Sequence, residues 1–153
     1  MNMYDQFGVD QNLETSGIWI DYDSFRVLVA RAGGSNKKYM SYAELKTKPF
    51  RRALQAGTMT NERSQALLYD IYAKTVILDW ETADGVDEKD GLTKWKKGIQ
   101  DREGNILPVT PENLIATFKA LPDLFTDLQQ AAESMSLFRK EEVEADAKNS
   151  SKS

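Results

Sequence analysis

The sequence predicts a mainly α protein: a small helical domain with an N-terminal β-hairpin and a long C-terminal helix. Apolar residues recur at helical spacing in several segments after residue 36. β-forming residues are concentrated before residue 31, and capping residues or prolines mark where successive helices begin. The 153 residues, 41% of them apolar, favour one domain with a modest core.

Composition divides the chain into three parts. Residues 1–15 are polar, so we expect a flexible N-terminus. Residues 16–140 should form a single α-rich domain, in which 16–31 is the β-hairpin and 82–105 is a loop insertion. Residues 141–153 combine mixed charge with low apolar content, which predicts a flexible tail that buries little surface.

The hairpin is predicted by the stretch "GIWIDYDSFRVLVAR". Its first half is rich in β-formers, and its second half alternates apolar residues with other types. The turn residues "DYDS" lie between the two halves. Because an isolated hairpin is marginally stable in water, this one should pack on helices or pair with another chain.

Capping signals predict the helices. After the glycine pair Gly33–Gly34, Ser35 or Asn36 can cap a helix that runs to about Thr47. A short second piece, "PFRRALQ", follows the break at Pro49. The strongest periodicity is in "NERSQALLYDIYAKTVILDW", for which Thr60 is the candidate cap and which predicts a helix over 61–80.

The last part of the chain predicts two further helices. Loop residues dominate from 82 to 105, and the pattern is restored at Thr110–Pro111, a cap followed by a proline in the first helical position. Pro122 then begins the long C-terminal helix "PDLFTDLQQAAESMSLFRKEEVEADA". Its apolar stripe consists of Leu124, Leu128, Ala131, Met135 and Phe138.

The sequence offers little catalytic or metal-binding chemistry. There are no cysteines and no histidines, which removes the commonest general base and nearly every structural zinc site. The segment "RAGGSNKKY" looks like a phosphate loop, but it fails the spacing of both glycine-rich phosphate motifs. Calcium loops aligned on Gly91 or Gly104 would place Val86 or Ile99 at the first ligand position. We therefore expect no enzyme activity, no cofactor and no metal.

The net charge of −4 hides a polarised distribution. The first 24 residues carry acidic side chains and no basic ones, whereas the segment 31–63 is strongly basic. Its basic residues are Arg31, Lys37, Lys38, Lys46, Lys48, Arg51, Arg52 and Arg63. Such polarity suits a charged partner or self-association. Its tyrosines fall at helical spacing and suit a core, so we do not expect nucleic acid as the partner.

The order of several segments resembles the tail assembly chaperones of long-tailed (siphovirus-like) bacteriophages. The resemblance covers roughly Gly17 to Asn149 and is carried mainly by "ARAGGSNKKY", "LPVTPEN" and "LPDLFTDL". None of these motifs has a chemical function, so the specificity comes from their order. Residues 87–100 look longer than the family pattern and are interpreted as an insertion of unknown role.

The resemblance implies a non-enzymatic role in viral tail assembly. Such chaperones coat the tape measure protein, keep it soluble and help tail tube subunits to polymerise around it. The expected partners are thus the tape measure protein and the tail tube (major tail) protein, with self-association left open and no membrane partner. The expected location is the host bacterial cytoplasm and not the mature virion. Many phages also make a longer frameshifted form, which a protein sequence cannot reveal.

The C-terminal helix offers a candidate client site. Phe125, Ala132, Met135 and Phe138 are the residues assigned to partner binding, because most of them lie beside the main stripe and aromatic or methionine side chains repack easily. The alternative is that a wide stripe is simply buried. Two other functions stay open: a structural tail or neck protein retained in the virion, and a small nucleic-acid-binding regulator that uses the basic segment.

Overall fold

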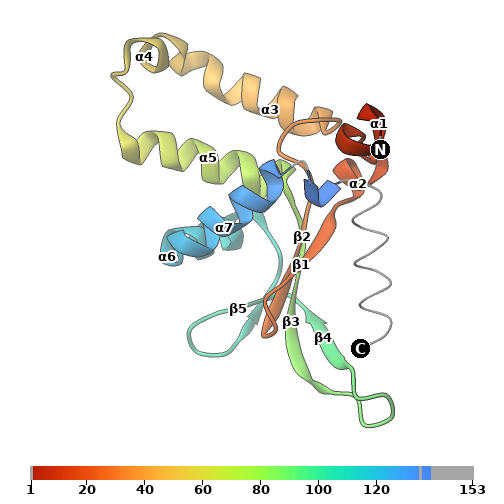
Figure 1. The fold of residues 1–153 in the computed structure, drawn as a ribbon. Helices are drawn as coiled ribbons and strands as arrows, with labels where there is room; N and C mark the ends of the chain where they lie inside the picture. The colour runs from red at the N-terminus through yellow and green to blue at the C-terminus, as the bar shows by residue number, and fades with distance from the viewer. Residues whose placement is uncertain (1, 135, 139–153) are drawn as a thin grey trace.

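A computed structural model of the chain describes residues 2–134 and 136–138. Figure 1 shows an arm of helices at one end of the molecule and a long two-stranded β-ribbon at the other. The helices are α1 (Met3–Phe7), α2 (Gln11–Ser16), α3 (Lys37–Thr47), the 3₁₀ turn η1 (Lys48–Phe50), α4 (Arg51–Ala56), α5 (Asn61–Thr75), α6 (Pro111–Ala120), α7 (Pro122–Glu133) and the 3₁₀ turn η2 (Ser136–Phe138). The strands are β1 (Ile18–Asp21), β2 (Phe25–Val29), β3 (Ile77–Val86), β4 (Thr93–Lys97), β5 (Ile99–Gln100) and β6 (Ile106–Leu107).

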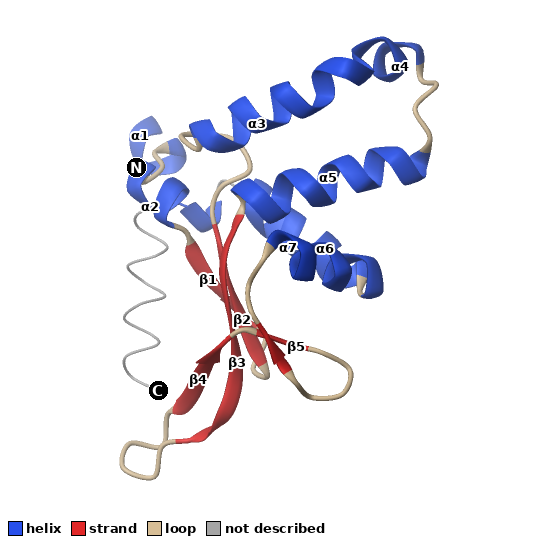
Figure 2. Ribbon diagram, turned by 180° about the vertical axis from the view of Figure 1, so that it is seen from behind, coloured by secondary structure: helices blue, strands red, loops and turns tan. Residues whose placement is uncertain are grey.

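The main sheet is antiparallel, with the strand order β1-β2-β3-β4 (Figure 2). The β-hairpin predicted over 16–31 is confirmed: Ile18 lies opposite Val29, and Asp21 lies opposite Arg26. In its turn the Asp21 carboxylate accepts the N–H of Asp23 at 2.8 Å. β5 and β6 form a separate two-stranded sheet beside α6.

The predicted fold class, mainly α, is wrong. About 52% of the described residues are helical and 21% are in strands, so the protein is an α/β mixture. The expected helix over 61–80 ends at Thr75, and Ile77–Val86 forms β3. The segment 82–105, expected as a loop insertion, holds the end of β3 together with β4 and β5. β-branched and aromatic residues at 76, 77 and 80 suit a strand at least as well as a helix. Antiparallel pairing with β2 stabilises the strand.

The long C-terminal helix is also wrong as far as the structure describes it. α7 ends at Glu133, and Ser134 is extended, with φ −75° and ψ 110°. The hydroxyl groups of Ser134 and Ser136 hydrogen-bond to each other at 3.0 Å. The N–H of Ser134 donates to the carbonyl oxygen of Ala131 at 3.2 Å, three residues back, so the last turn tightens where the helix ends. The charged tail predicted for 141–153 lies outside the described residues.

The N-terminus holds regular structure where the sequence suggested a flexible segment. α1 begins with a capping box between Asn2 and Asp5, and Asp10 caps α2 by accepting the N–H of Asn12 at 2.9 Å. α2 also carries Glu14, whose side chain is fully buried. Residues 1–15 therefore contribute to the interior through at least one side chain.

The core lies between the sheet and the helices α5, α6 and α7. Val27 and Val29 of β2 and Trp80 of β3 supply its sheet side. Aromatic rings supply its helical side, namely Tyr69, Tyr72, Phe118 and Phe125. The helix caps predicted at Asn36, Thr60 and Thr110 are confirmed, since each side chain accepts a backbone N–H three residues further on. No helix within the described part of the chain is long and apolar enough to cross a membrane.

Candidate functional site

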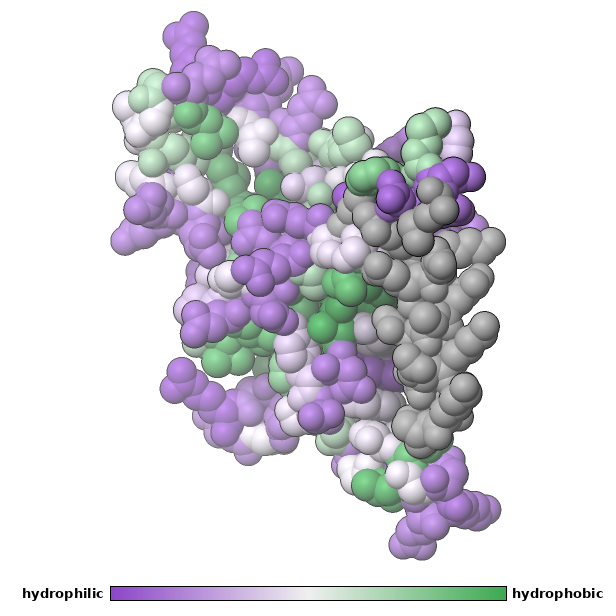
Figure 3. All heavy atoms as spheres, viewed as in Figure 1, coloured by the Kyte–Doolittle hydropathy of each residue, from purple (hydrophilic) through white to green (hydrophobic). Residues whose placement is uncertain are grey.

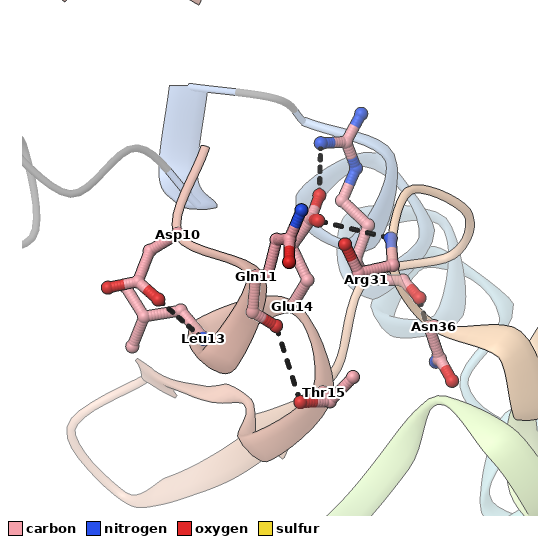
Figure 4. Close-up of polar contacts among 8 residues, drawn as sticks. Asp10, Gln11, Leu13, Glu14, Thr15, Arg31 and Asn36 are labelled. Carbon is pink, nitrogen blue, oxygen red and sulfur yellow. Dashed lines mark hydrogen bonds and ion pairs between the residues drawn. The ribbon is translucent and has the colours of Figure 1, made fainter. Parts of the chain in front are cut away.

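The glycine-rich segment that resembles a phosphate loop encloses an anion of the protein itself (Figure 4). The Arg31 guanidinium donates from Nη1 to Oε2 of Glu14 at 2.8 Å, and the backbone N–H of Ser35 donates to Oε1 at 3.1 Å. The amide of Asn36 then donates to the carbonyl oxygens of Arg31 and Thr75, at 2.8 and 3.1 Å. The loop therefore fastens α2 to the start of α3, and the Glu14 carboxylate fills the position that a ligand anion would need.

Glycine is required in this loop for two reasons. Gly34 has φ +54°, and a Cβ there would lie 2.3 Å from Oε2 of Glu14. Gly57, which ends α4, has a similar φ of +68° but open space around it. The two positions thus share the backbone strain that a side chain would cause, and differ in the steric clash.

We expect Gly34→Ala to destabilise the fold more than Gly57→Ala. The Gly57 variant should lose about 1–2 kcal/mol, the cost of left-handed backbone for an L-residue. The Gly34 variant should lose that and about 1–3 kcal/mol more, because it displaces a buried hydrogen-bonded carboxylate. Urea denaturation of the two variants measures the difference. Equal losses would mean that the loop tolerates a Cβ against Glu14.

Three of the four residues assigned from the sequence to client binding are buried. Phe125 is 1% exposed, and Ala132 and Phe138 are fully buried. Met135 lies outside the described residues. Phe138 packs under Arg31, and its carbonyl oxygen accepts the N–H of Asp10 at 2.9 Å. Phe125 and Ala132 of α7 and Phe138 of η2 are therefore not available at the surface.

A groove between α3 and α5 is a better candidate for a contact surface. It begins beside η1, where Pro49 turns the chain, and has a volume of about 450 Å³. Its lining is Leu45, Lys46, Pro49, Phe50, Arg63, Ala66, Leu67 and Asp70. Figure 3 shows hydrophobic residues exposed between hydrophilic ones over this arm of the molecule. Leu45, which lines the groove, is 64% exposed.

A polar network closes the end of the groove at Asp70, which we call the inner end. The Tyr42 hydroxyl donates to Oδ2 of Asp70 at 2.8 Å, and Lys74 donates to the Tyr42 oxygen at 2.9 Å. Asp70 also pairs with Lys74 at 3.2 Å and lies 3.9 Å from Lys46. These hydrogen bonds to Tyr42 and Asp70, with the charge of Asp70, raise the pKa of Lys74 above its ordinary value. The acidic residue of the groove is thus already matched by protein cations.

The outer end of the groove is basic. Lys48, Arg51 and Arg52 are exposed beside the lining residues, and the Arg63 guanidinium lies 5.5 Å from the centre of the Phe50 ring. Between residues 46 and 63 the one acidic residue is Glu62. The result is an apolar trough with a positively charged rim, an arrangement that could receive an apolar and acidic surface of a partner.

The outer face of the sheet carries a second cluster that the sequence analysis missed. Arg26 lies between two indole rings, 4.4 Å from the centre of Trp19 and 4.5 Å from that of Trp95, and it pairs with Glu81. These residues come from four different strands, so only the register brings them together. Because Glu81 already pairs with the guanidinium, we interpret the cluster as cross-strand stabilisation of the outer face of the sheet.

The groove and the outer sheet face are two contact surfaces formed by the described side chains. Within residues 2–134 and 136–138, no group of three or more acidic, histidine or cysteine side chains could hold a metal ion. The groove of α3 and α5 was not predicted, although Pro49 and the alternation of basic and apolar residues around it gave a signal. In the sequence these basic residues suggested only a nucleic-acid pattern.

Comparison with known proteins places the chain in a family. No curated protein and no solved structure gives a significant match. The family described as YdaY prophage protein matches residues 34–96 and 92–149. The matched segments include the whole arm of α3, α4 and α5, and they meet in β4, within the segment 87–100 that was interpreted as an insertion. The chain therefore belongs to the YdaY prophage protein family and is of phage origin.

Proposed function

We propose that the protein is a tail assembly chaperone, which binds the tape measure protein of its phage through the groove between α3 and α5. It acts without catalysis, in the host cytoplasm, and leaves before the virion is complete. The prophage family supports the phage context, and the resemblance of the ordered segments supports the role in tail assembly. The tail tube protein is the second partner, which would assemble around the client as the chaperone is displaced.

The observation that carries the proposal is an apolar groove open between two helices on an otherwise charged surface. Exposed apolar surface of this kind marks interaction sites in soluble proteins. A groove between two helices is also the usual receptor for the apolar face of a third helix. A long helical client that is insoluble before assembly needs such a receptor.

Co-expression with the tape measure protein of the same phage tests the proposal directly. A tagged copy of this chain should retain the tape measure protein on a column and keep it in the soluble fraction. If the client stays insoluble and unbound, the proposal fails.

Mass spectrometry of purified virions separates the chaperone from a structural tail or neck protein, because a retained structural protein would be found in the particle.

A nucleic-acid-binding regulator is a second candidate, favoured by the basic rim of the same groove. Binding of that kind depends steeply on salt, because phosphate contacts release counterions. Titration of a DNA duplex at several salt concentrations would reveal it. The chaperone proposal expects no specific complex with DNA.

A further inference from the structure

The groove between α3 and α5 has the size of a short helix-binding site. On α5 its lining runs from Arg63 to Asp70, eight residues or about 12 Å, which matches about two turns of a partner helix. The apolar contribution of α5 to the groove comes from Ala66 and Leu67, one turn above Arg63. On the opposite wall Leu45, Pro49 and Phe50 present apolar surface from α3 and η1.

The charges around the groove are unbalanced. Asp70 is satisfied by Tyr42, Lys74 and Lys46, so it adds no free negative charge to the inner end. At the outer end Lys48, Arg51 and Arg52 are exposed. A partner that matches this rim must carry negative charge beside its apolar stripe.

We propose that the groove binds one amphipathic α-helix whose apolar stripe is flanked by acidic residues. The apolar stripe would lie on Leu45, Phe50 and Leu67, and the carboxylates would face the rim at Lys48, Arg52 and Arg63. The lining and the rim of the groove specify this chemistry of the helix. That the helix is a segment of the tape measure protein rests on the proposed function.

The geometry favours a helix over a nucleic acid at this place. A single-stranded nucleic acid needs aromatic faces that are free for stacking. Phe50, the aromatic residue of the groove lining, is half-buried and already lies under the Arg63 guanidinium. The groove floor is apolar and offers a poor surface for phosphates, whereas the side chains of a helix can fill it.

Designed peptides test the charge requirement. Two labelled peptides of about 18 residues, or five turns, share one leucine stripe at helical spacing and differ in the flanking residues, glutamate in one and lysine in the other. By fluorescence anisotropy the glutamate peptide should bind at least about tenfold more tightly, since rim charges would attract one and repel the other. Its affinity should also fall as salt rises from about 50 to 300 mM. Equal affinities, or no binding of the glutamate peptide, would overturn the proposal.

Matched variants locate the binding site. Leu45→Asp should reduce the affinity of the glutamate peptide, whereas Leu121→Asp, at a residue 52% exposed between α6 and α7, should not. Lys48→Glu with Arg52→Glu should reduce it as well, and Lys94→Glu with Lys96→Glu on β4 provides the control with the same charge change. All six substituted positions are exposed, so the melting temperatures should stay close to that of the parent protein. Equal losses in the groove variants and in their controls would place the binding elsewhere.

The same variants distinguish this inference from the proposed function. If the parent protein and the groove variants all retain the tape measure protein in a pull-down, the chaperone function stands and the groove proposal fails. If the glutamate peptide binds the groove but the tape measure protein is not retained, the groove proposal stands and the chaperone function fails. A DNA duplex that binds the parent protein, and is lost with Lys48→Glu and Arg52→Glu but not with Leu45→Asp, would assign the rim to nucleic acid instead.

Discussion

Glu14→Ala is expected to lower the free energy of unfolding by about 3–5 kcal/mol, the usual cost of removing one partner from a buried ion pair. The carboxylate is fully buried and accepts hydrogen bonds from Arg31 and from the backbone of Ser35. Its loss would remove the acceptor of the Nη1 hydrogen bond of Arg31. Because Nε of Arg31 also lacks a hydrogen-bond partner among the described residues, the guanidinium would then be poorly satisfied. Urea denaturation followed by circular dichroism measures the change.

A more exposed ion pair provides the control. Glu81 pairs with Arg26 at 2.5 Å, but the two side chains are 17% and 28% exposed and Arg26 also contacts two indole rings. Glu81→Ala should therefore cost about 1 kcal/mol, nearer to the value of a surface pair. Replacing both Glu14 and Arg31 by methionine should recover part of the loss, because no charge is then left buried. A Glu14 variant as stable as the Glu81 variant would show that α2 is not fastened to the loop.

Local signals were sufficient for the beginnings of the helices. Asn36, Thr60 and Thr110 each lie directly before an apolar-periodic segment, and each caps the helix that follows. The hairpin was equally predictable, because "DYDS" separates two β-rich stretches. These features depend on contacts within four or five residues, which a sequence displays directly.

The missed features depend on contacts between distant segments. The apolar residues from 76 to 80 fit a helix as well as a strand, and pairing of Val27 with Trp80 decides for the strand. β4 reads "TKWKK", a polar stretch that is held in the sheet by β3. Its lysines suit an edge strand, because they discourage pairing with other chains, but they hid the strand from a hydrophobicity pattern.

The candidate site also depends on contacts between distant segments. The spacing of the glycine loop argued against a phosphate site, but its anionic occupant, Glu14, lies in a segment that looked unstructured. The groove needs α3 and α5 side by side, which no local pattern specifies. Most of the residues assigned to client binding lie beside the main apolar stripe of the C-terminal helix, and a wide buried stripe was the alternative. α7 in fact packs against α6 and the sheet as well as against α5, so its second face is buried too.

Phe125→Ala is expected to cost about 3–5 kcal/mol, the range for removing a buried phenylalanine side chain. The ring is 1% exposed and meets three aromatic neighbours at centroid distances of 4.7 to 5.2 Å. These neighbours are Tyr69, Tyr72 and Phe118. The substitution would therefore open a cavity where α5, α6 and α7 meet, and thermal unfolding should begin at a lower temperature.

Leu45→Ala is the matched control, because it removes a large apolar side chain that is 64% exposed. It should change the free energy of unfolding by less than about 0.5 kcal/mol, as surface substitutions usually do. In a pull-down below the melting temperature of both variants, Leu45→Ala should retain less tape measure protein than Phe125→Ala does. The opposite pattern, a stable Phe125 variant that has lost the client, would return the client site to α7 and would mean that this helix leaves the core when the client binds.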